Sequence, residues 1–402
     1  MSATIRTRRL EADADLLAVA GRDGFVFLHD GHGLAGRGIA GRIALEAPWP
    51  SAVELAAREL GAMDVDDELE RPGSGVVAFA ALPFERDAPA ELLIPEVVVG
   101  RSRDGTRWIT TVGDHDAEPE APAAPPMPEP ACHELIAERP PRAWADAVAD
   151  AAGRIRDGRL EKVVLARELE IRTDVPIDRG VVLDRLARAF PSSMVYGVGG
   201  FVGASPELLV GRTGDVVRAQ PMAGTTPRTG DPTRDVQLAA ALLASAKDRQ
   251  EHQFTIDAVH DGLLPWCSYL DAGTEPEVFS VANVQHLAST VEGRLSHPPA
   301  SILQLVAGLH PTPAVGGQPT DEATTLLRAI EGRDRGPYAG PVGWVDGAGN
   351  GRFAVGIRGA ELAETTARVL SGVGVVADSD PEAELAETRA KLRAILGALV
   401  SP

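Results

Sequence analysis

The chain contains 402 residues, of which 44% are hydrophobic and 24% are charged, and its formal net charge is −19. This length and hydrophobic share are sufficient for a large core, in one large domain or in two ordinary ones. The acidic balance argues against nucleic acid or an anionic membrane as a partner, although a local basic pocket could still take a small anionic substrate.

The cysteine and hydropathy patterns indicate a soluble protein of the cytoplasm. The two cysteines, Cys132 and Cys267, form no CxxC motif and have no metal-ligand spacing, so we expect no disulfide framework. Residues 1–10 contain arginines but lack the apolar region of a signal peptide. No apolar run reaches the length that a membrane crossing needs.

Composition divides the chain into three parts. Residues 1–115 alternate short β-type runs with turns and carry no cluster of chemically reactive residues. Residues 116–141 are rich in Pro, Ala and Glu, which predicts an extended connector that buries little surface. Residues 142–402 form the predicted catalytic region. The sequence leaves open whether the first and last parts are separate domains or two pieces of one sandwich. In the first part we expect a helix at 52–60 and strands at 24–28, 75–80, 95–100 and 108–112.

Two charged residues of the catalytic region lie beside apolar strands. Lys162 begins a strand, and it is either an edge lysine that discourages aggregation or a lysine desolvated enough to act as a base. Glu207 follows a Ser-Pro turn. It is either exposed to water or held with a raised pKa, which would keep it protonated at neutral pH. The neighbouring elements are predicted as helices at 142–157 and 183–190 and strands at 162–167 and 194–198, followed by the β-type segment 200–210, which contains the Ser-Pro turn.

The middle of the catalytic region offers a turn and a long helix. Residues 220–228 predict a tight polar turn, in which backbone amides and Thr225 could meet a substrate oxygen, or an ordinary loop. An Asp-Pro pair then opens a helix predicted over 231–264. Glu251 on this helix is either a metal-binding carboxylate or one charge of a solvated face.

Further along, the pattern predicts strands that carry one histidine and one arginine. The strand 284–293 contains His286, and a lone histidine on a strand is more often a hydrogen-bonded core residue than a catalyst. The segments 338–344 and 353–361 predict a strand pair around a glycine-rich turn. Arg358, inside the second segment, either grips a carboxylate in a bidentate manner or faces solvent.

The segment 369–391 predicts a strand, a turn and a helix. Asp380 suits the N-cap, and the proline that follows it suits the first helical position. Glu384 and Glu387 share one face of the helix, and Lys391 extends that face. The two carboxylates could hold a hard cation such as Mg²⁺, whereas the alternative is a solvated face with a Glu387–Lys391 pair.

Several short motifs, taken in order, resemble the chorismate-utilising enzymes, which include anthranilate, aminodeoxychorismate, salicylate and isochorismate synthases. The resemblance covers residues 142–399. It implies an α+β fold with a large antiparallel β-sandwich and flanking helices, as in anthranilate synthase component I. The motifs lie at 162–167, 203–207, 223–225, 247–252, 338–340 and 372–391.

Within this family the chain looks most like the isochorismate synthases. The loop 310–317, His-Pro-Thr-Pro-Ala-Val-Gly-Gly, and the block 247–252 are typical of that branch. Aminating members usually have a different loop and rely on a glutaminase, and salicylate synthases share the metal, acid and base. One departure is Thr226, where the family commonly has an arginine; Arg228 remains. Any anchoring of this turn by the first arginine is therefore left open.

The resemblance implies Mg²⁺-dependent conversion of chorismate into isochorismate for siderophore or menaquinone synthesis. It implies Lys162 as general base on a water that attacks ring carbon 2, and Glu207 as general acid toward the departing 4-hydroxyl. We expect a monomer without a glutaminase partner. The implied metal ligands are Glu251, Glu384 and Glu387. The implied substrate-binding residues are Gly224, Thr225, His286, Tyr338, Arg358, Gly372, Gly374 and Lys391.

Overall fold

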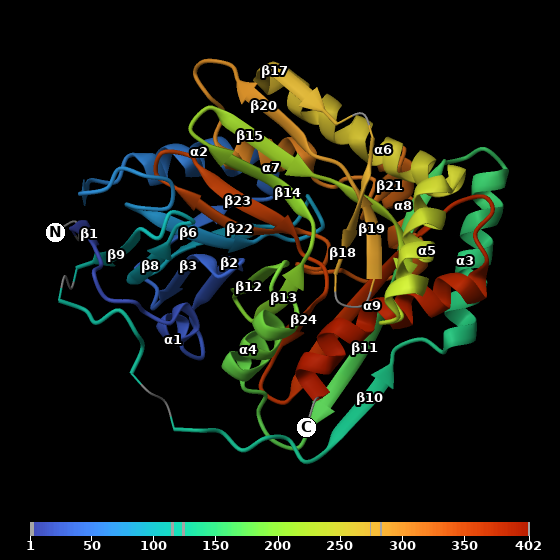
Figure 1. Ribbon diagram of the computed structural model, residues 1–402, viewed down its shortest axis with the longest axis horizontal. Helices are drawn as coiled ribbons and strands as arrows, with labels where there is room; N and C mark the ends of the chain where they lie inside the picture. The colour runs from blue at the N-terminus through green and yellow to red at the C-terminus, as the bar shows by residue number, and fades with distance from the viewer. Residues whose placement is uncertain (1–3, 114–115, 123–124, 274, 282–283, 401–402) are drawn as a thin grey trace.

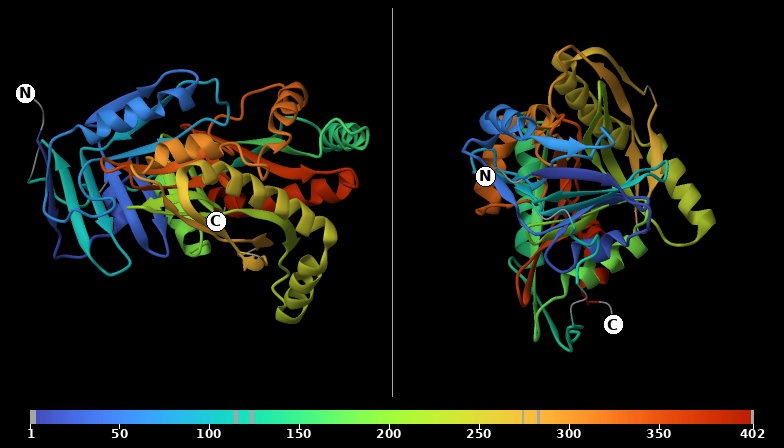
Figure 2. Two further views of the ribbon diagram at one scale, coloured as in Figure 1. Left: turned by 90° about the horizontal axis from the view of Figure 1, so that it is seen from above. Right: turned by 90° about the vertical axis from the view of Figure 1, so that its left-hand side faces the viewer.

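The computed structural model describes residues 4–113, 116–122, 125–273, 275–281 and 284–400. Two large β-sheets pack face to face, helices lie outside them, and a smaller three-stranded sheet stands beside them (Figures 1 and 2). Apolar side chains of both large sheets meet in one buried cluster, which includes Phe27 of one sheet and Phe79 of the other. This contact makes the fold a sandwich.

The strands pair in an order that crosses the sequence repeatedly. The 13-stranded sheet runs β10 (His133–Ala137), β11 (Lys162–Thr173), β25 (Thr366–Val375), β24 (Gly359–Leu362), β13 (Phe201–Ser205), β12 (Met194–Val198), β2 (Phe25–His29), β3 (His32–Arg37), β8 (Val97–Arg101), β9 (Arg107–Val112), β1 (Ile5–Arg9), β5 (Val65–Asp67), and β21 (Gly317–Gln318) also pairs with β11. The 9-stranded sheet runs β17 (Cys267–Ala272), β20 (Val291–Leu295), β15 (Val216–Gln220), β14 (Leu208–Thr213), β23 (Gly351–Val355), β22 (Pro341–Asp346), β6 (Val77–Ala81), β7 (Ala90–Ile94), β4 (Gly41–Leu45). The 3-stranded sheet runs β16 (Met222–Pro227), β19 (Val284–Ala288), β18 (Glu277–Ser280).

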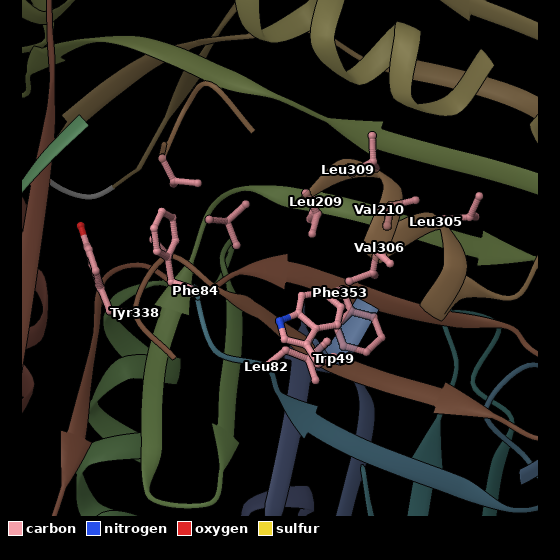
Figure 3. Close-up of a cluster of buried hydrophobic side chains, with 14 of the residues drawn as sticks. Trp49, Leu82, Phe84, Leu209, Val210, Leu305, Val306, Leu309, Tyr338 and Phe353 are labelled. Atoms are coloured by element: carbon pink, nitrogen blue, oxygen red, sulfur yellow. The ribbon is translucent and has the colours of Figure 1, made fainter. Parts of the chain in front are cut away.

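Helices cover the outer faces of the two large sheets. Figure 3 shows the buried cluster in which Trp49 and Leu305, from two helices, pack on Val210 and Phe353 of the 9-stranded sheet. None of the helices in the described ranges is long and apolar enough to cross a membrane. The helices are α1 (Leu16–Ala20), α2 (Trp49–Gly61), α3 (Pro141–Arg156), α4 (Arg179–Ala189), α5 (Pro232–Ala244), α6 (Ala246–Leu263), the short 3₁₀ helix η1 (Leu264–Trp266), α7 (Ile302–Leu309), α8 (Thr320–Glu331) and α9 (Pro381–Val400).

The N-terminal and C-terminal parts of the chain are built into the same sheets. In one sheet β2 pairs with β12, and in the other β6 pairs with β22. The two parts are therefore pieces of one sandwich, and the structure has the α+β architecture that the resemblance implied. The predicted strands β2, β6, β8, β9, β12 and β25 and the predicted helices α2, α3, α4 and α9 are confirmed within a few residues.

Two segments predicted as single elements are divided in the structure, and a third is divided at a turn that was predicted within it. The helix expected over 231–264 breaks into α5 and α6 at Ser245, whose hydroxyl accepts a hydrogen bond from the Asp248 amide (3.2 Å) and caps the second helix. The segment 284–293 becomes β19 and β20, which belong to two different sheets. The segment 200–210 becomes β13 and β14, which also belong to two sheets and are divided at the predicted Ser-Pro turn. Local pattern cannot show such a division, because a strand that changes sheets keeps the same β-type composition.

Three further predictions need correction. Residues 220–228 form mainly the strand β16, with a register shift at Gly224 (φ 71°), and not a tight turn. Arg358 (φ 56°) lies in the bend between β23 and β24, and not inside a strand. The connector, predicted as an extended segment that buries little surface, contains the strand β10, which pairs with β11.

Candidate active site

One pocket brings together all the site residues that the sequence predicted. It lies between two walls. The β11–β25 wall consists of β11, β25 and the first turns of α9, and the β16–β19 wall consists of β16, β19 and the start of α6. The predicted residues that line the pocket are Lys162, Glu207, Gly224, Thr225, Glu251, His286, Tyr338, Arg358, Gly372, Gly374, Glu384, Glu387 and Lys391.

The β11–β25 wall places Lys162 in the protein interior. The side chain of Lys162 is 1% exposed, and its Nζ lies 2.8 Å from Oε1 of Glu251, which comes from α6 in the opposite wall. Burial alone would raise the pKa of Glu251, but the charge and hydrogen bond of Lys162 together with the charges of Lys391 and Lys247 outweigh burial, and the pKa lies below its usual value. A Cβ atom at Gly374 would approach this Glu251 oxygen to 2.6 Å, so only glycine leaves room for the pair.

The start of α9 supplies two carboxylates and a lysine. Asp380 accepts a hydrogen bond from the Ala383 amide (2.8 Å) and caps the helix, as predicted. Glu384 is 6% exposed, and burial together with the neighbouring Glu387 carboxylate raises its pKa to about 7. Lys391 pairs with Glu387 (2.7 Å) and also donates to the Gly372 carbonyl (3.0 Å), which ties the helix to β25.

The β16–β19 wall holds His286 in one tautomer. Arg358 can only donate, so the 3.2 Å contact of its Nη2 with His286 Nε2 makes that nitrogen an acceptor and puts the ring proton on Nδ1. Nδ1 then donates to the Gly224 carbonyl (3.2 Å), with Thr225 Oγ1 at 3.1 Å. Burial, Arg358 and Lys391 lower the pKa of His286 to about 3, so the ring is neutral. His286 is thus both hydrogen-bonded in the interior and part of the pocket.

Glu207 is the buried carboxyl at the bend between β13 and β14. Its side chain is 4% exposed, so the exposed turn glutamate is the wrong alternative. Burial raises the pKa of Glu207 to about 7, against a hydrogen bond from the Met222 amide and the more distant charge of Lys162. Backbone bonds fix the bend, because Glu207 donates its amide to Ser205 Oγ (3.3 Å) and its carbonyl accepts from the Val355 amide (3.1 Å). A carboxyl with this pKa is partly protonated at neutral pH, as a general acid must be.

The three predicted metal ligands are each close to a lysine. Besides the two pairs above, Glu384 lies 3.9 Å from Lys247. Across the described residues, no group of His, Cys, Asp or Glu side chains is already arranged around a metal position. The donor set nevertheless fits Mg²⁺, since it offers only carboxylate oxygens, and the repulsion between Glu384 and Glu387 is the kind that a divalent cation relieves.

The pocket also contains residues that the sequence did not single out as ligands. Lys247 and Asp248 belong to the motif 247–252, so their block was recognised although their side chains were not assigned. Ala314 and Val315 come from the loop 310–317, which the sequence marked as typical of the isochorismate synthase branch. Leu370 lines the pocket from β25, and nothing in an apolar strand distinguishes it from a core residue.

Comparison with known proteins supports the same family. A family model described as chorismate binding enzyme matches residues 64–400. The isochorismate synthase DhbC of Bacillus subtilis is 38% identical over 335 residues, which cover 79% of this chain and 79% of that protein.

Two solved structures share the fold. The menaquinone-specific isochorismate synthase MenF of Escherichia coli matches with a TM-score of 0.80 at 22% identity, over 98% of this chain and 96% of that one. Anthranilate synthase component I of Streptococcus pneumoniae matches with a TM-score of 0.73 at 21% identity, over 96% and 93%. The sandwich architecture that the sequence predicted is therefore confirmed.

Proposed function

The chain belongs to the chorismate-binding enzyme family, and on this premise we propose that it is an isochorismate synthase. The observation that carries the proposal is the pocket, in which a buried lysine, a buried carboxyl with a raised pKa and a group of acidic side chains meet. Chorismate is a dianion. The lysines and Arg358 in the pocket supply the positive charge that an otherwise acidic protein needs to bind it.

In the proposed reaction a water oxygen bonds to ring carbon 2, the ring double bonds shift, and the 4-hydroxyl departs. Water is a poor nucleophile, so Lys162 removes its proton as the new bond forms. Lys162 has to enter this step without its own proton, so the ion pair with Glu251 has to open first. A positioned base of this kind typically contributes about 10²–10⁴-fold to the rate.

Glu207 acts at the other end of the ring. Hydroxide is a poor leaving group, so Glu207 gives its proton to the departing oxygen and water leaves. A pKa of about 7 keeps a substantial fraction of Glu207 protonated at neutral pH. Burial thus keeps the proton on the acid, whereas the base can act only after its ion pair with Glu251 has opened.

The remaining predicted residues orient the substrate. We assign the carboxylates of chorismate to Arg358, Tyr338, Lys391 and the backbone near Gly372 and Gly374. Gly224, Thr225 and the neutral His286 lie along the ring. In a buried pocket these donors also exclude water other than the reacting molecule.

Glu251, Glu384 and Glu387 are the side chains that we propose to hold Mg²⁺. When bound, the ion would screen the negative charge of the substrate and hold one of its carboxylates. The same three glutamates are paired with, or close to, lysines in the structure, so the lysine charges occupy this acidic corner of the pocket.

The proposal extends to the setting of the enzyme. We place it in the cytoplasm as a monomer that works without a glutaminase and feeds siderophore or menaquinone synthesis. Substrate and product are isomers with the same kinds of bond, so the equilibrium should lie near unity and net flux needs an enzyme that consumes isochorismate. Complete conversion of chorismate by the purified enzyme, without such a trap, would contradict this.

Product analysis tests the proposal. Purified enzyme is incubated with chorismate and Mg²⁺ without ammonia, the products are separated by chromatography, and EDTA serves as the control. We expect isochorismate to approach a steady ratio with chorismate and to disappear with EDTA. Salicylate together with stoichiometric pyruvate would indicate a salicylate synthase instead. A reaction that starts only when ammonia is added would indicate an aminating subunit.

A further inference from the structure

Arg335 lies directly behind the pocket, with its guanidinium buried. The residue is 2% exposed and does not itself line the pocket. Nε and Nη2 donate to the two carboxylate oxygens of Glu331 on α8 (2.8 and 2.6 Å). Nη1 donates to the Val315 carbonyl (2.9 Å), and Nη2 also donates to the Val164 carbonyl (2.6 Å).

The two backbone acceptors belong to two segments that line the pocket, the strand β11 and the loop 310–317. Val164 lies in β11 two residues after Lys162, and Val315 lies in the loop 310–317; both side chains line the pocket. Glu331 adds a second hold on β11, since its Oε1 accepts from the Ala166 amide (2.8 Å). One buried ion pair therefore binds both the strand of the proposed base and the loop whose last residue, Gly317, pairs with Val163 of that strand.

The same arginine connects this system to the N-terminal part of the chain. Its guanidinium carbon lies 4.5 Å from the centroid of Phe84, which belongs to the buried cluster in Figure 3 together with Tyr338 and Trp49. The Phe84 carbonyl accepts from His310 Nε2 (2.9 Å), and the His310 ring packs between Phe84 and Trp49. The first residue of the loop is thus held from the N-terminal part.

We propose that Arg335 is a positioning residue, which fixes β11 and the loop 310–317 against each other and so sets the geometry around Lys162. Replacing both partners of a buried ion pair by apolar residues often leaves the stability of a protein unchanged, because the cost of desolvating the charges offsets most of their attraction. A buried ion pair can instead serve to specify one arrangement of the segments that it joins. The planar fork of arginine reaches Glu331, Val315 and Val164 at once. The single nitrogen of lysine cannot span these directions.

Steady-state kinetics of Arg335→Lys test this role, with Arg333→Lys as the matched control. Arg333 is close in sequence and also pairs with carboxylates, those of Glu138 and Glu168, but its side chain is about half exposed. We expect Arg335→Lys to lower kcat about 10²-fold, because small misplacement of reacting groups has effects of this size. KM should stay within about threefold, since the carboxylate-binding side chains are intact. The alkaline limb of the pH profile should also stay in place, because the acid and base are unchanged.

Amide hydrogen exchange on the substrate-free protein provides a second measurement. Faster exchange in both 162–167 and 310–318 of Arg335→Lys, with native exchange in Arg333→Lys, is the expected result. Native kcat in Arg335→Lys, or a reduced kcat while both segments keep native exchange, would overturn the proposal. Loss of protection throughout the variant would also overturn it, because Arg335 would then serve general stability.

The kinetic arm rests on the proposed function, whereas the exchange arm does not. If the native enzyme forms no isochorismate, the proposed function fails, and the exchange of the two segments still decides whether Arg335 holds them. If the native enzyme is active and only the Arg335 expectations fail, the positioning role alone is wrong.

Discussion

The two walls of the pocket differ in how they are built. The β11–β25 wall is a long antiparallel pair in continuous register from Val163 opposite Val375 to Arg172 opposite Thr366, and its inward apolar side chains belong to the main core. The β16–β19 wall belongs to a 3-stranded sheet whose register shifts at Gly224. Helix α5, which lies beside this sheet in Figure 1, buries only Asp235 and Leu242.

Because of this difference, we expect substitutions in the two walls to have different effects on protein stability and on turnover. The β11–β25 wall carries the proposed base inside the core, so changes there should affect folding and turnover together. The β16–β19 wall is a short sheet with a shifted register, and although β19 is buried, β16 becomes half-exposed from Thr225 onward. Changes in that part of β16 should therefore affect turnover with little effect on folding. Two contacts join the walls, the Lys162–Glu251 ion pair and the longer approach of Lys247 to Glu384.

The largest effect is expected for Lys162→Ala. Isochorismate formation should fall by about 10²–10⁴-fold or more, because water loses its base. The free energy of unfolding should also fall by about 3–5 kcal/mol, since Glu251 would keep a buried charge without its partner. Initial rates and urea unfolding measure the two effects. Lys247→Ala, about half exposed, is the control for stability and should unfold like the native protein. Near-normal turnover in Lys162→Ala would refute the assignment of the base.

The second-largest effect is expected for Glu207→Gln, and this substitution should also change how the activity depends on pH. Glu207 is protonated below its pKa of about 7 and loses the acid form as pH rises through that value. The kcat/KM of the native enzyme should therefore decline above about pH 7, and Glu207→Gln should lower kcat about 10²-fold and remove that limb. A pH–rate profile of both proteins decides this. An alkaline limb that persists near pH 7 in the variant would assign it to another group.

Where a helix or strand begins was easier to predict from the sequence than which other strands it pairs with. The strand, N-cap and helix at 369–391 follow from local chemistry, since Asp380 and the proline after it mark a helix start in any context. The break at Ser245 was missed because residues of high helix propensity continue on both sides, mainly alanine and leucine before it and alanine, lysine, arginine and glutamine after it, and the serine cap is a small signal within them. The crossing from one sheet to the other between β13 and β14 depends on strands far away in sequence.

The same limit applies to the site. Local sequence left Glu207 with two alternatives, and its burial is decided by residues such as Met222 and Val355 from other strands. The pairing of Lys162 with Glu251 joins residues that no periodicity connects. The ordered motifs of the family, and not the local patterns, identified the residues that gather in the pocket. Arg335 went unnoticed because its partners are mostly backbone carbonyls, which leave no mark in the sequence.

A smaller effect is expected for Gly374→Ala, which tests whether the walls must approach this closely. The new Cβ would lie 2.6 Å from Glu251 Oε1 and 2.9 Å from Lys162 Cε. We expect a loss of about 1–3 kcal/mol in unfolding free energy and about tenfold in kcat. Gly397→Ala is the control, since Gly397 is exposed on α9 with open space around it and should gain about 0.5–1 kcal/mol. Native stability and turnover in Gly374→Ala would show that the walls tolerate a wider separation.

The smallest effect is expected for Thr225→Val, which removes a hydroxyl from the β16–β19 wall at constant shape. That hydroxyl lies 3.1 Å from His286 Nδ1, and a hydrogen bond of this kind is worth about 0.5–1.5 kcal/mol. We expect kcat/KM to fall about two- to tenfold while the free energy of unfolding falls by about 0.5 kcal/mol, the low end of this range, because the hydroxyl lies in a half-buried position at the pocket. Thr226→Val, the next residue of β16 and outside the pocket lining, should change neither quantity. If Thr225→Val instead destabilises the protein as much as Gly374→Ala, the two walls are equally coupled to the core, and the contrast between them is wrong.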